Sequence, residues 1–139
     1  MAETVNLDAR IAELLRTHGI TPTSQRVSVA SVLMARNVHL SALDVVDQVS
    51  ILDSGVSRAT VYNTLARLVD AGLIRELNVG SNRVFYDSNI SPHHHFYNVE
   101  SGELIDIDSN AIEIKGMPEL PDGLELESIQ LTVRIKATA

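Results

Sequence analysis

The sequence predicts an α+β protein made of two small lobes, and three observations lead to this prediction. Apolar residues recur with a helical period of about 3.6 as far as Gly72. From Ile74 onwards the apolar pattern alternates, as is typical of strands. The 139 residues suit one domain, or two small lobes that complete their cores by pairing with a second copy.

Two helices are predicted at the start of the chain. The first covers residues 7–18 and ends at Gly19. Its apolar face is formed by Leu7, Ile11, Leu14 and Leu15. Thr23 is a suitable N-cap for the second helix, which runs to about Arg36. The inward residues of this second helix are Val27, Ala30 and Leu33.

Two more helices are expected before Gly72. Ser41 is predicted to cap the third, whose core-facing residues are Leu43, Val46 and Val49. Ser57 is predicted to cap the fourth, and Gly72 ends it. The apolar stripe of this fourth helix is Val61, Leu65 and Leu68. The residues left on its other faces are Arg58, Thr60, Tyr62, Asn63 and Arg67.

A strand pair follows the helices. Residues 74–79 and 83–87 are predicted as strands joined by a turn at Gly80, Ser81 and Asn82. Helices followed by a small hairpin form a winged helix, in which the last helix enters the major groove of DNA. The sequence therefore predicts a winged-helix domain over residues 1–87, an architecture that is typical of DNA-binding domains.

The remaining residues are expected to form a second, small α/β domain. Residues 88–92 are predicted as a hinge. Residues 93–99 and 103–107 should pair around a turn at Ser101 and Gly102, and residues 124–136 should form a last strand with a bulge. Residues 93–139 make up this second domain.

Charge and composition narrow the classes of function. Residues 1–88 hold eight arginines and nine acids, whereas residues 89–139 hold three basic and nine acidic residues. The arginines of the first part suit contacts with phosphate and base edges, although each one alone is more often a solvated side chain. The absence of cysteine excludes disulfides, thiolate zinc sites and a cysteine nucleophile. With no apolar run near ~20 residues and no targeting signal at the start, we expect a cytoplasmic bacterial protein.

The fourth helix has residues suited to DNA. Hydroxyl groups near its start, on Ser57 and Thr60, can reach phosphates with help from the helix dipole. One turn on, Tyr62 and Asn63 can meet thymine methyls and adenine edges. An ordinary amphipathic helix with a solvent-exposed polar face shows the same pattern. These residues alone therefore leave DNA binding open.

The histidines are the stronger local signal. His93 and His95 should project from one face of a strand and His94 from the other. Asp87 and Asp106 lie nearby in the expected topology, and imidazoles with carboxylates suit Fe, Mn, Zn or Co. A surface histidine run without a ligand and axial ligation of haem iron are the alternatives.

Several segments together resemble one family. The run SRATVYNTLARLVDAGLI looks like the recognition-helix signature of the ferric uptake regulator family, and TPTSQR resembles the start of its second helix. The similarity continues through the wing and HHHFYN to GLELESIQLTVRI, which is most of the chain. It implies a homodimeric transcriptional repressor that binds an AT-rich, palindromic operator and is not an enzyme. Gln25 and Arg26 should then contact the phosphate backbone of the DNA. The residues that should read its base edges are Arg58, Thr60, Tyr62 and Asn63.

The resemblance also implies a regulatory metal site. The helix histidine of the family matches His39, placed at the start of the third helix, and its hinge acid matches Asp87. The remaining ligands of the family match His93, His95 and Asp106. In the family, metal at this site closes the DNA-binding lobes onto the operator. The implied ion is Fe²⁺ or Mn²⁺, with Zn²⁺ also binding in vitro.

Other family features are missing. Asn98 and Ser101 replace the first cysteine pair of the structural zinc site, so no four-cysteine zinc is expected. A second histidine-and-acid site is dismantled, with Pro92, His94 and Ile129 at its positions. These losses and the histidine triplet are similar to the iron response regulator branch, which senses iron through haem. This similarity implies haem binding by the triplet, residues 93–95. Together with the metal ligands, it implies that residues 93–139 form the domain for dimerisation and for sensing metal or haem.

The main hypothesis is therefore an iron-responsive regulator of iron and haem metabolism, acting through haem or a bound metal. The alternative is a peroxide-sensing repressor, in which iron at the same five ligands oxidises a histidine. A metalloenzyme is disfavoured because no general base or nucleophile accompanies the ligands. A haem carrier with a vestigial DNA lobe would bind haem without preferring an operator.

Overall fold

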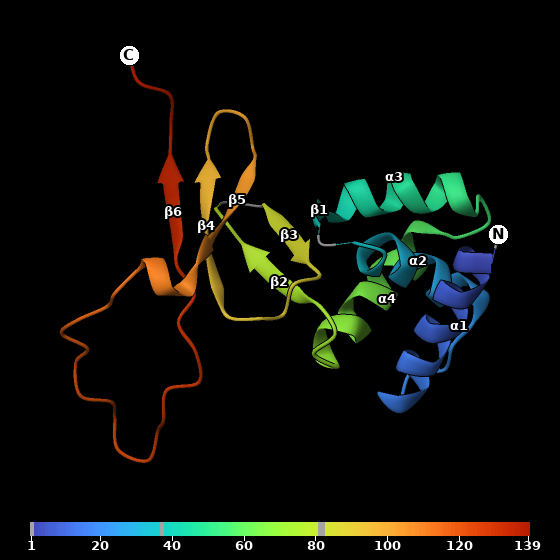
Figure 1. Ribbon diagram of the computed structural model, residues 1–139, viewed down its shortest axis with the longest axis horizontal. Helices are drawn as coiled ribbons and strands as arrows, with labels where there is room; N and C mark the ends of the chain where they lie inside the picture. The colour runs from blue at the N-terminus through green and yellow to red at the C-terminus, as the bar shows by residue number, and fades with distance from the viewer. Residues whose placement is uncertain (1, 37, 81–82) are drawn as a thin grey trace. The chain divides into compact units, whose positions relative to one another are not determined.

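The computed structural model describes residues 2–36, 38–80 and 83–139, with side chains from residue 7 onwards. The chain divides into two compact units, Met1–Ile90 and Ser91–Ala139. The helices α1 to α4 and the strands β1 to β3 belong to the first unit, and β4 to β6 belong to the second (Figure 1). In the described part of the chain, no helix combines the length and the apolar character needed to span a membrane.

The first two helices agree with the predicted caps. α1 (Ala2–Thr17) starts earlier than expected and is followed by Gly19 at a φ of 75°. Leu14, predicted on its apolar face, is 36% exposed. α2 (Ser24–Met34) is capped by Thr23, whose side chain accepts a hydrogen bond from the backbone N–H of Arg26.

Helix α3 (Ala42–Leu52) begins at the predicted cap but turns a different face to the core. The Ser41 side chain accepts from the N–H of Asp44, and the Asp44 carboxylate accepts from the N–H of Ser41, which is a complete capping box. Leu43 was predicted in the core and is 55% exposed, whereas Val45 is fully buried with Val49. Two residues turn a helix by about 200°, so Leu43 must face away once Val45 faces inward.

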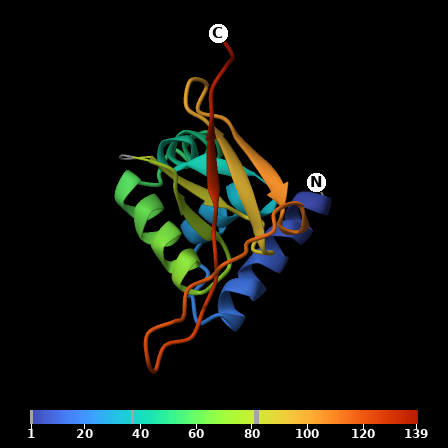
Figure 2. The ribbon, with the colours of Figure 1, turned by 90° about the vertical axis from the view of Figure 1, so that its left-hand side faces the viewer.

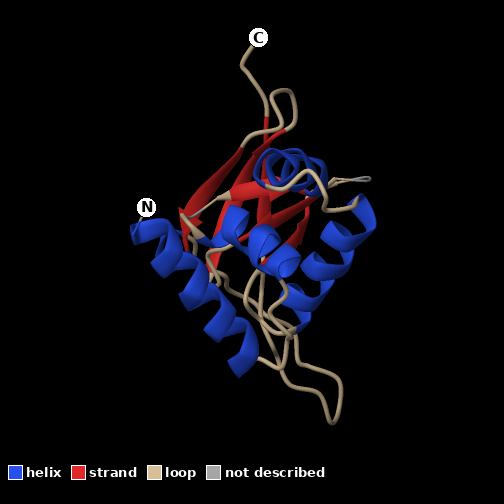
Figure 3. Cartoon of the chain, turned by 90° about the vertical axis from the view of Figure 1, so that its right-hand side faces the viewer, coloured by secondary structure: helices blue, strands red, loops and turns tan. Residues whose placement is uncertain are grey.

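Helix α4 (Arg58–Asp70) matches its prediction closely. The Ser57 side chain caps it by accepting from the N–H of Thr60, and Gly72 adopts a φ of 75° just beyond its end. Helix α2 contacts α1, α3 and α4, and the helices pack around one apolar core (Figure 3). The fully buried aliphatic side chains of this core include Leu15, Val29, Leu33, Val45, Val49, Leu65 and Leu68.

The first unit also carries a three-stranded antiparallel sheet in the order β1-β3-β2. The hairpin of β2 (Arg75–Asn78) and β3 (Val84–Asp87) confirms the predicted strand pair. The expected turn residues Ser81 and Asn82 lie outside the described residues. β1 (His39–Ser41) was not predicted, and His39, placed at the start of the third helix, lies in this strand instead. A strand of three residues is too short to show a period of its own.

The second unit is a mixed three-stranded sheet with β4 (His93–Asn98) in the middle. β5 (Leu104–Asp108) pairs with it antiparallel, as predicted, and β6 (Thr132–Ile135) pairs with it in parallel (Figure 2). The only helix described in this unit is the 3-10 turn Ser109–Ala111.

The last strand is much shorter than predicted. Residues 124–131 form no regular element, and the expected bulge has no strand to interrupt. Leu124 and Leu126 are 65% and 53% exposed, so no core holds this segment in an extended ladder. The strand begins only where β4 offers backbone partners.

Candidate metal centre and nucleic-acid interface

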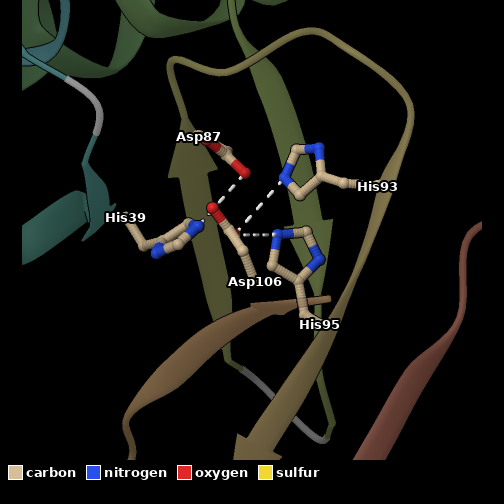
Figure 4. Close-up of side chains that lie close together, drawn as sticks. All are labelled: His39, Asp87, His93, His95 and Asp106. Atoms are coloured by element: carbon tan, nitrogen blue, oxygen red, sulfur yellow. Dashed lines mark ion pairs between the residues drawn. The ribbon is translucent and has the colours of Figure 1, made fainter. Parts of the chain in front are cut away.

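The first unit brings two predicted metal ligands together. The antiparallel register of β1 and β3 sets His39 opposite Asp87, and His39 Nε2 lies 3.3 Å from Asp87 Oδ2 (Figure 4). Asp87 is 1% exposed. Its Oδ1 accepts a hydrogen bond from the N–H of Asn89 at 2.8 Å, which fixes the carboxylate. A buried carboxylate needs a positive charge or strong donors nearby, so this pair is a suitable place for a cation.

The second unit brings together three more. His93 and His95 project from the same face of β4, and the β4–β5 register sets His95 opposite Asp106. Asp106 Oδ1 lies 3.5 Å from His93 Nε2 and 3.3 Å from His95 Nε2 (Figure 4). The two imidazoles are 6% and 2% exposed. Two ring nitrogens therefore converge on one carboxylate oxygen at distances that a shared cation would explain.

The hydrogen bonding of His93 supports this interpretation. Its Nδ1 lies 2.6 Å from the carbonyl oxygen of Ser91, which can only accept, so Nδ1 carries the hydrogen. In the neutral ring Nε2 is then the nitrogen with the lone pair, which is the form of imidazole that can bind a metal ion. Metal-ligating histidines commonly donate their second N–H to a backbone carbonyl in this way. The donor set of imidazole nitrogens and carboxylates suits Mn, Fe or Zn.

The five predicted ligands thus form a pair on the first unit and a trio on the second. Each of the five offers a ring nitrogen or a carboxylate oxygen that can bind a metal ion. The remaining histidine of the triplet behaves differently. His94 projects from the opposite face of β4 and accepts a hydrogen bond on Nδ1 from the N–H of Leu131 at 3.1 Å. It was predicted as a haem ligand, and it is 8% exposed.

Four of the seven predicted DNA-binding residues line one pocket between α2 and α4, whereas Ser57, Arg58 and Tyr62 are not part of its lining. Gln25 and Arg26 from the start of α2 lie there with Thr60 and Asn63 of α4. The full lining is Thr23, Gln25, Arg26, Ala59, Thr60, Asn63 and Thr64. Arg26 Nη1 donates to the carbonyl of Thr21 at 2.9 Å, which steadies the guanidinium beside the helix N-terminus. The pocket can therefore offer cationic and backbone donors to a phosphate.

The outer face of α4 is partly organised by its own hydrogen bonds. Tyr62 is 42% exposed. Asn63 Oδ1 accepts from Arg67 Nε at 3.3 Å, so Arg67 orients the amide. Arg67 was absent from the predicted contact set, although its spacing of four residues from Asn63 could have indicated the pair. Ser57, predicted as a DNA contact, has its hydroxyl engaged in the helix cap and with the Thr60 hydroxyl at 2.9 Å.

Tyr86, on strand β3 of the β2–β3 hairpin, lies near Tyr62 of α4. Burial raises the pKa of Tyr86 above its usual value, and the nearby Glu76 and Tyr62 raise that pKa further. Glu76 is its cross-strand partner in the β2–β3 register. Tyr86 therefore stays a neutral phenol throughout the physiological pH range, and it lines one pocket with Tyr62.

One protein family matches most of this chain. The model of the ferric uptake regulator family matches residues 17–134, which is most of the chain. The chain belongs to the ferric uptake regulator family. It is therefore a member of a family of metal-responsive transcription regulators and not an enzyme.

Relatives of this ferric uptake regulator family member include peroxide sensors. The peroxide-responsive repressor of Staphylococcus aureus is 31% identical over 100 residues, covering 72% of this chain and 67% of the relative. That of Staphylococcus epidermidis is 29% identical over 108 residues, covering 76% and 72%. These similarities do not point specifically to the iron response regulator branch.

Solved structures of family members share the fold. The ferric uptake regulator from Pseudomonas aeruginosa, determined with manganese, gives a TM-score of 0.71 at 26% identity and covers 91% of this chain and 97% of its own. That from Francisella tularensis, determined with iron, gives 0.71 at 25% identity and covers 86% and 92%. These matches agree with the predicted α+β fold, a winged-helix domain followed by a dimerisation domain.

Proposed function

We propose that this chain is a dimeric, metal-responsive repressor whose operator affinity depends on one divalent ion, Fe²⁺ or Mn²⁺. The ligands would be the predicted five: His39, Asp87, His93, His95 and Asp106. The observation that carries the proposal is the convergence of His93 Nε2 and His95 Nε2 on one oxygen of Asp106. The manganese and iron in the two related structures support the choice of ion.

The proposed ion acts by joining the two units. His39 and Asp87 belong to the first, and the other three ligands belong to the second. An ion that takes ligands from both is fully coordinated only in one arrangement of the units around residues 88–92. Binding therefore shifts the population of the dimer towards that arrangement. Operator affinity rises if that arrangement spaces the two α4 helices correctly on DNA.

The DNA partner is proposed to be an AT-rich, roughly palindromic operator. Tyr62, Asn63, Arg58 and Thr60 would read base edges in the major groove, with Ser57 near the phosphates. Gln25 and Arg26 would hold the phosphate backbone from the pocket beside α4. In a two-fold dimer the half-sites must lie about one helical turn, or a multiple of it, apart.

Dimerisation is assigned to residues 93–139. This unit exposes large apolar side chains on its sheet and on the segment before β6, such as Ile105, Leu124, Leu126 and Val133. Exposed apolar groups gathered on a small unit commonly mark an interface with another chain. A second copy of this chain is the proposed partner.

Metal dependence is tested by titrating an operator with the full chain at fixed salt, with Mn²⁺ and after chelation. The operator is selected from a random duplex pool with the Mn²⁺-loaded protein. We expect chelation to weaken binding by about tenfold or more, as for allosteric couplings of about 1–3 kcal/mol. Equal affinity in both conditions would contradict a metal-responsive regulator.

Haem is tested as a third condition of the same titration. The relatives above are peroxide-responsive repressors, and the related structures were determined with manganese or iron. Loss of operator binding on adding stoichiometric haem to the Mn²⁺-loaded protein would make haem the signal. Unchanged binding would leave the metal as the signal.

Peroxide sensing is the second candidate, because the Staphylococcus aureus relative is a peroxide-responsive repressor. Iron at the proposed site would direct oxidation to a histidine ligand. Iron-loaded protein treated with peroxide should then gain about 16 Da, one oxygen atom, on a peptide containing His39 or His93 and His95. Mn²⁺-loaded protein is the control. Unmodified ligand peptides after DNA release would exclude this candidate.

A further inference from the structure

We infer that His94 is a positioning residue, which anchors the last strand to the strand that carries the ligands, and that it is not itself a ligand of metal or haem. The inference rests on the proposed function only in taking His93 and His95 as ligands. It concerns contacts within the second unit alone.

His94 and His95 together hold the backbone of one residue. The N–H of Leu131 donates to His94 Nδ1 at 3.1 Å, and the carbonyl of Leu131 accepts from the N–H of His95 at 3.1 Å. Leu131 immediately precedes β6, so both of its backbone polar groups are satisfied by neighbouring residues of β4. The side chain of His94 thus takes the place of one further rung at the start of the β4–β6 ladder.

Strand β6 is short and mostly exposed. Its four residues lie at the edge of the sheet, and three of their side chains are exposed. The twenty residues 112–131 that lead to it contain no helix or strand. Ordering such a long connection costs conformational entropy. This cost is opposed by the β4–β6 ladder, by the hydrogen bond from the N–H of Val99 to the carbonyl of Ile135, and by the contact of Arg134 with the Tyr97 ring. A partly buried side-chain hydrogen bond where the ladder begins should therefore contribute measurably to holding this edge strand.

The same hydrogen bond makes His94 unsuitable as a ligand. Because Nδ1 accepts from Leu131, the hydrogen of the neutral ring must be on Nε2, which then has no lone pair for iron. Ligation through Nε2 would require the hydrogen on Nδ1, where it would face the N–H of Leu131. Two donors would then oppose each other, and the anchor of β6 would be lost. His93 has the reverse arrangement, with the hydrogen on Nδ1.

Three substitutions separate the two roles. The His94→Asn variant keeps an acceptor, Oδ1, at the place of Nδ1, and His94→Leu has nearly the same shape without an acceptor. His94→Gln places its acceptor further out, near the position of Nε2. Amide hydrogen exchange at residues 131–135 of the full chain is the direct readout. We expect exchange about five- to tenfold faster in the Leu and Gln variants, as for loss of an ordinary hydrogen bond, and near wild type in the Asn variant.

Titration with Mn²⁺ and with haem tests the ligand role. The asparagine side chain cannot replace an imidazole ligand, so His94→Asn should bind both as wild type does, within about twofold, if His94 is only an anchor. Weakened binding of either in His94→Asn, with normal exchange at residues 131–135, would overturn the inference. Unchanged exchange in both the Leu and Gln variants would overturn it as well. If the Leu variant does not fold, the Asn and Gln pair decides. A wild-type chain that binds no Mn²⁺ refutes the proposed function, and the exchange data still decide the role of His94.

Discussion

Replacing His95 with alanine is expected to lower the affinity of the chain for Mn²⁺ by at least about a hundredfold. Loss of a residue that merely supports a ligand often costs 10- to about 100-fold in affinity, so removal of a ligand should cost as much or more. His95 is 2% exposed and faces Asp106, and after the substitution the carboxylate would keep only one of its two imidazole partners in this trio. Calorimetric titration of the full chain measures the change.

The matched control is His18→Ala. His18 is an exposed histidine at the end of α1, and its Nδ1 lies 2.8 Å from the carbonyl of Leu14. This variant loses an imidazole without touching the proposed ligands, so its Mn²⁺ affinity should equal that of the wild type. Equal losses in the two variants would mean that binding is non-specific. No loss in His95→Ala would exclude His95 as a ligand.

The second large effect is expected on α4. The double substitution Tyr62→Ala with Asn63→Ala should weaken operator binding by about a hundredfold, since each base contact contributes roughly 1–3 kcal/mol. Removing Asn63 also removes the acceptor that holds Arg67, so part of the loss comes from a released guanidinium. Gel-shift titration with the selected operator gives the affinity.

Binding of the same variant to non-operator DNA is the internal control. Gln25 and Arg26 remain, so phosphate contacts and the salt dependence of non-specific binding should change little. A uniform loss on all DNA would show that Tyr62 and Asn63 do not read the sequence. Unchanged operator affinity would show that α4 does not enter the groove in the proposed way.

The helices could be predicted from the sequence because their signals are local. Thr23, Ser41 and Ser57 each cap the helix that they were expected to cap. The inward stripe of α4 was correct, while that of α3 was wrong at Leu43 because Val45 and Val49 satisfy the helical spacing equally well. Helical periodicity alone does not choose between such neighbouring stripes.

The candidate site was only partly predictable, because its partners are distant in sequence. His39 was proposed as a ligand from the family resemblance, and its pairing with Asp87 depends on the strand β1, which no local pattern indicated. The alternation along β4 correctly separated His94 from its two neighbours. The bond of His94 to Leu131 joins residues 37 positions apart and cannot be read from periodicity. The long last strand was overpredicted for a similar reason, since a strand exists only where it has a partner.

The central claim is that a single ion takes ligands from both units, and metal stoichiometry tests it most directly. Wild type, His39→Ala and His95→Ala are loaded with Mn²⁺, dialysed and analysed for bound metal per chain. His39 lies on the first unit and His95 on the second. If one ion joins the units, wild type retains one tightly bound ion per chain and each variant retains none. Two ions in wild type, with one left in each variant, would contradict the account.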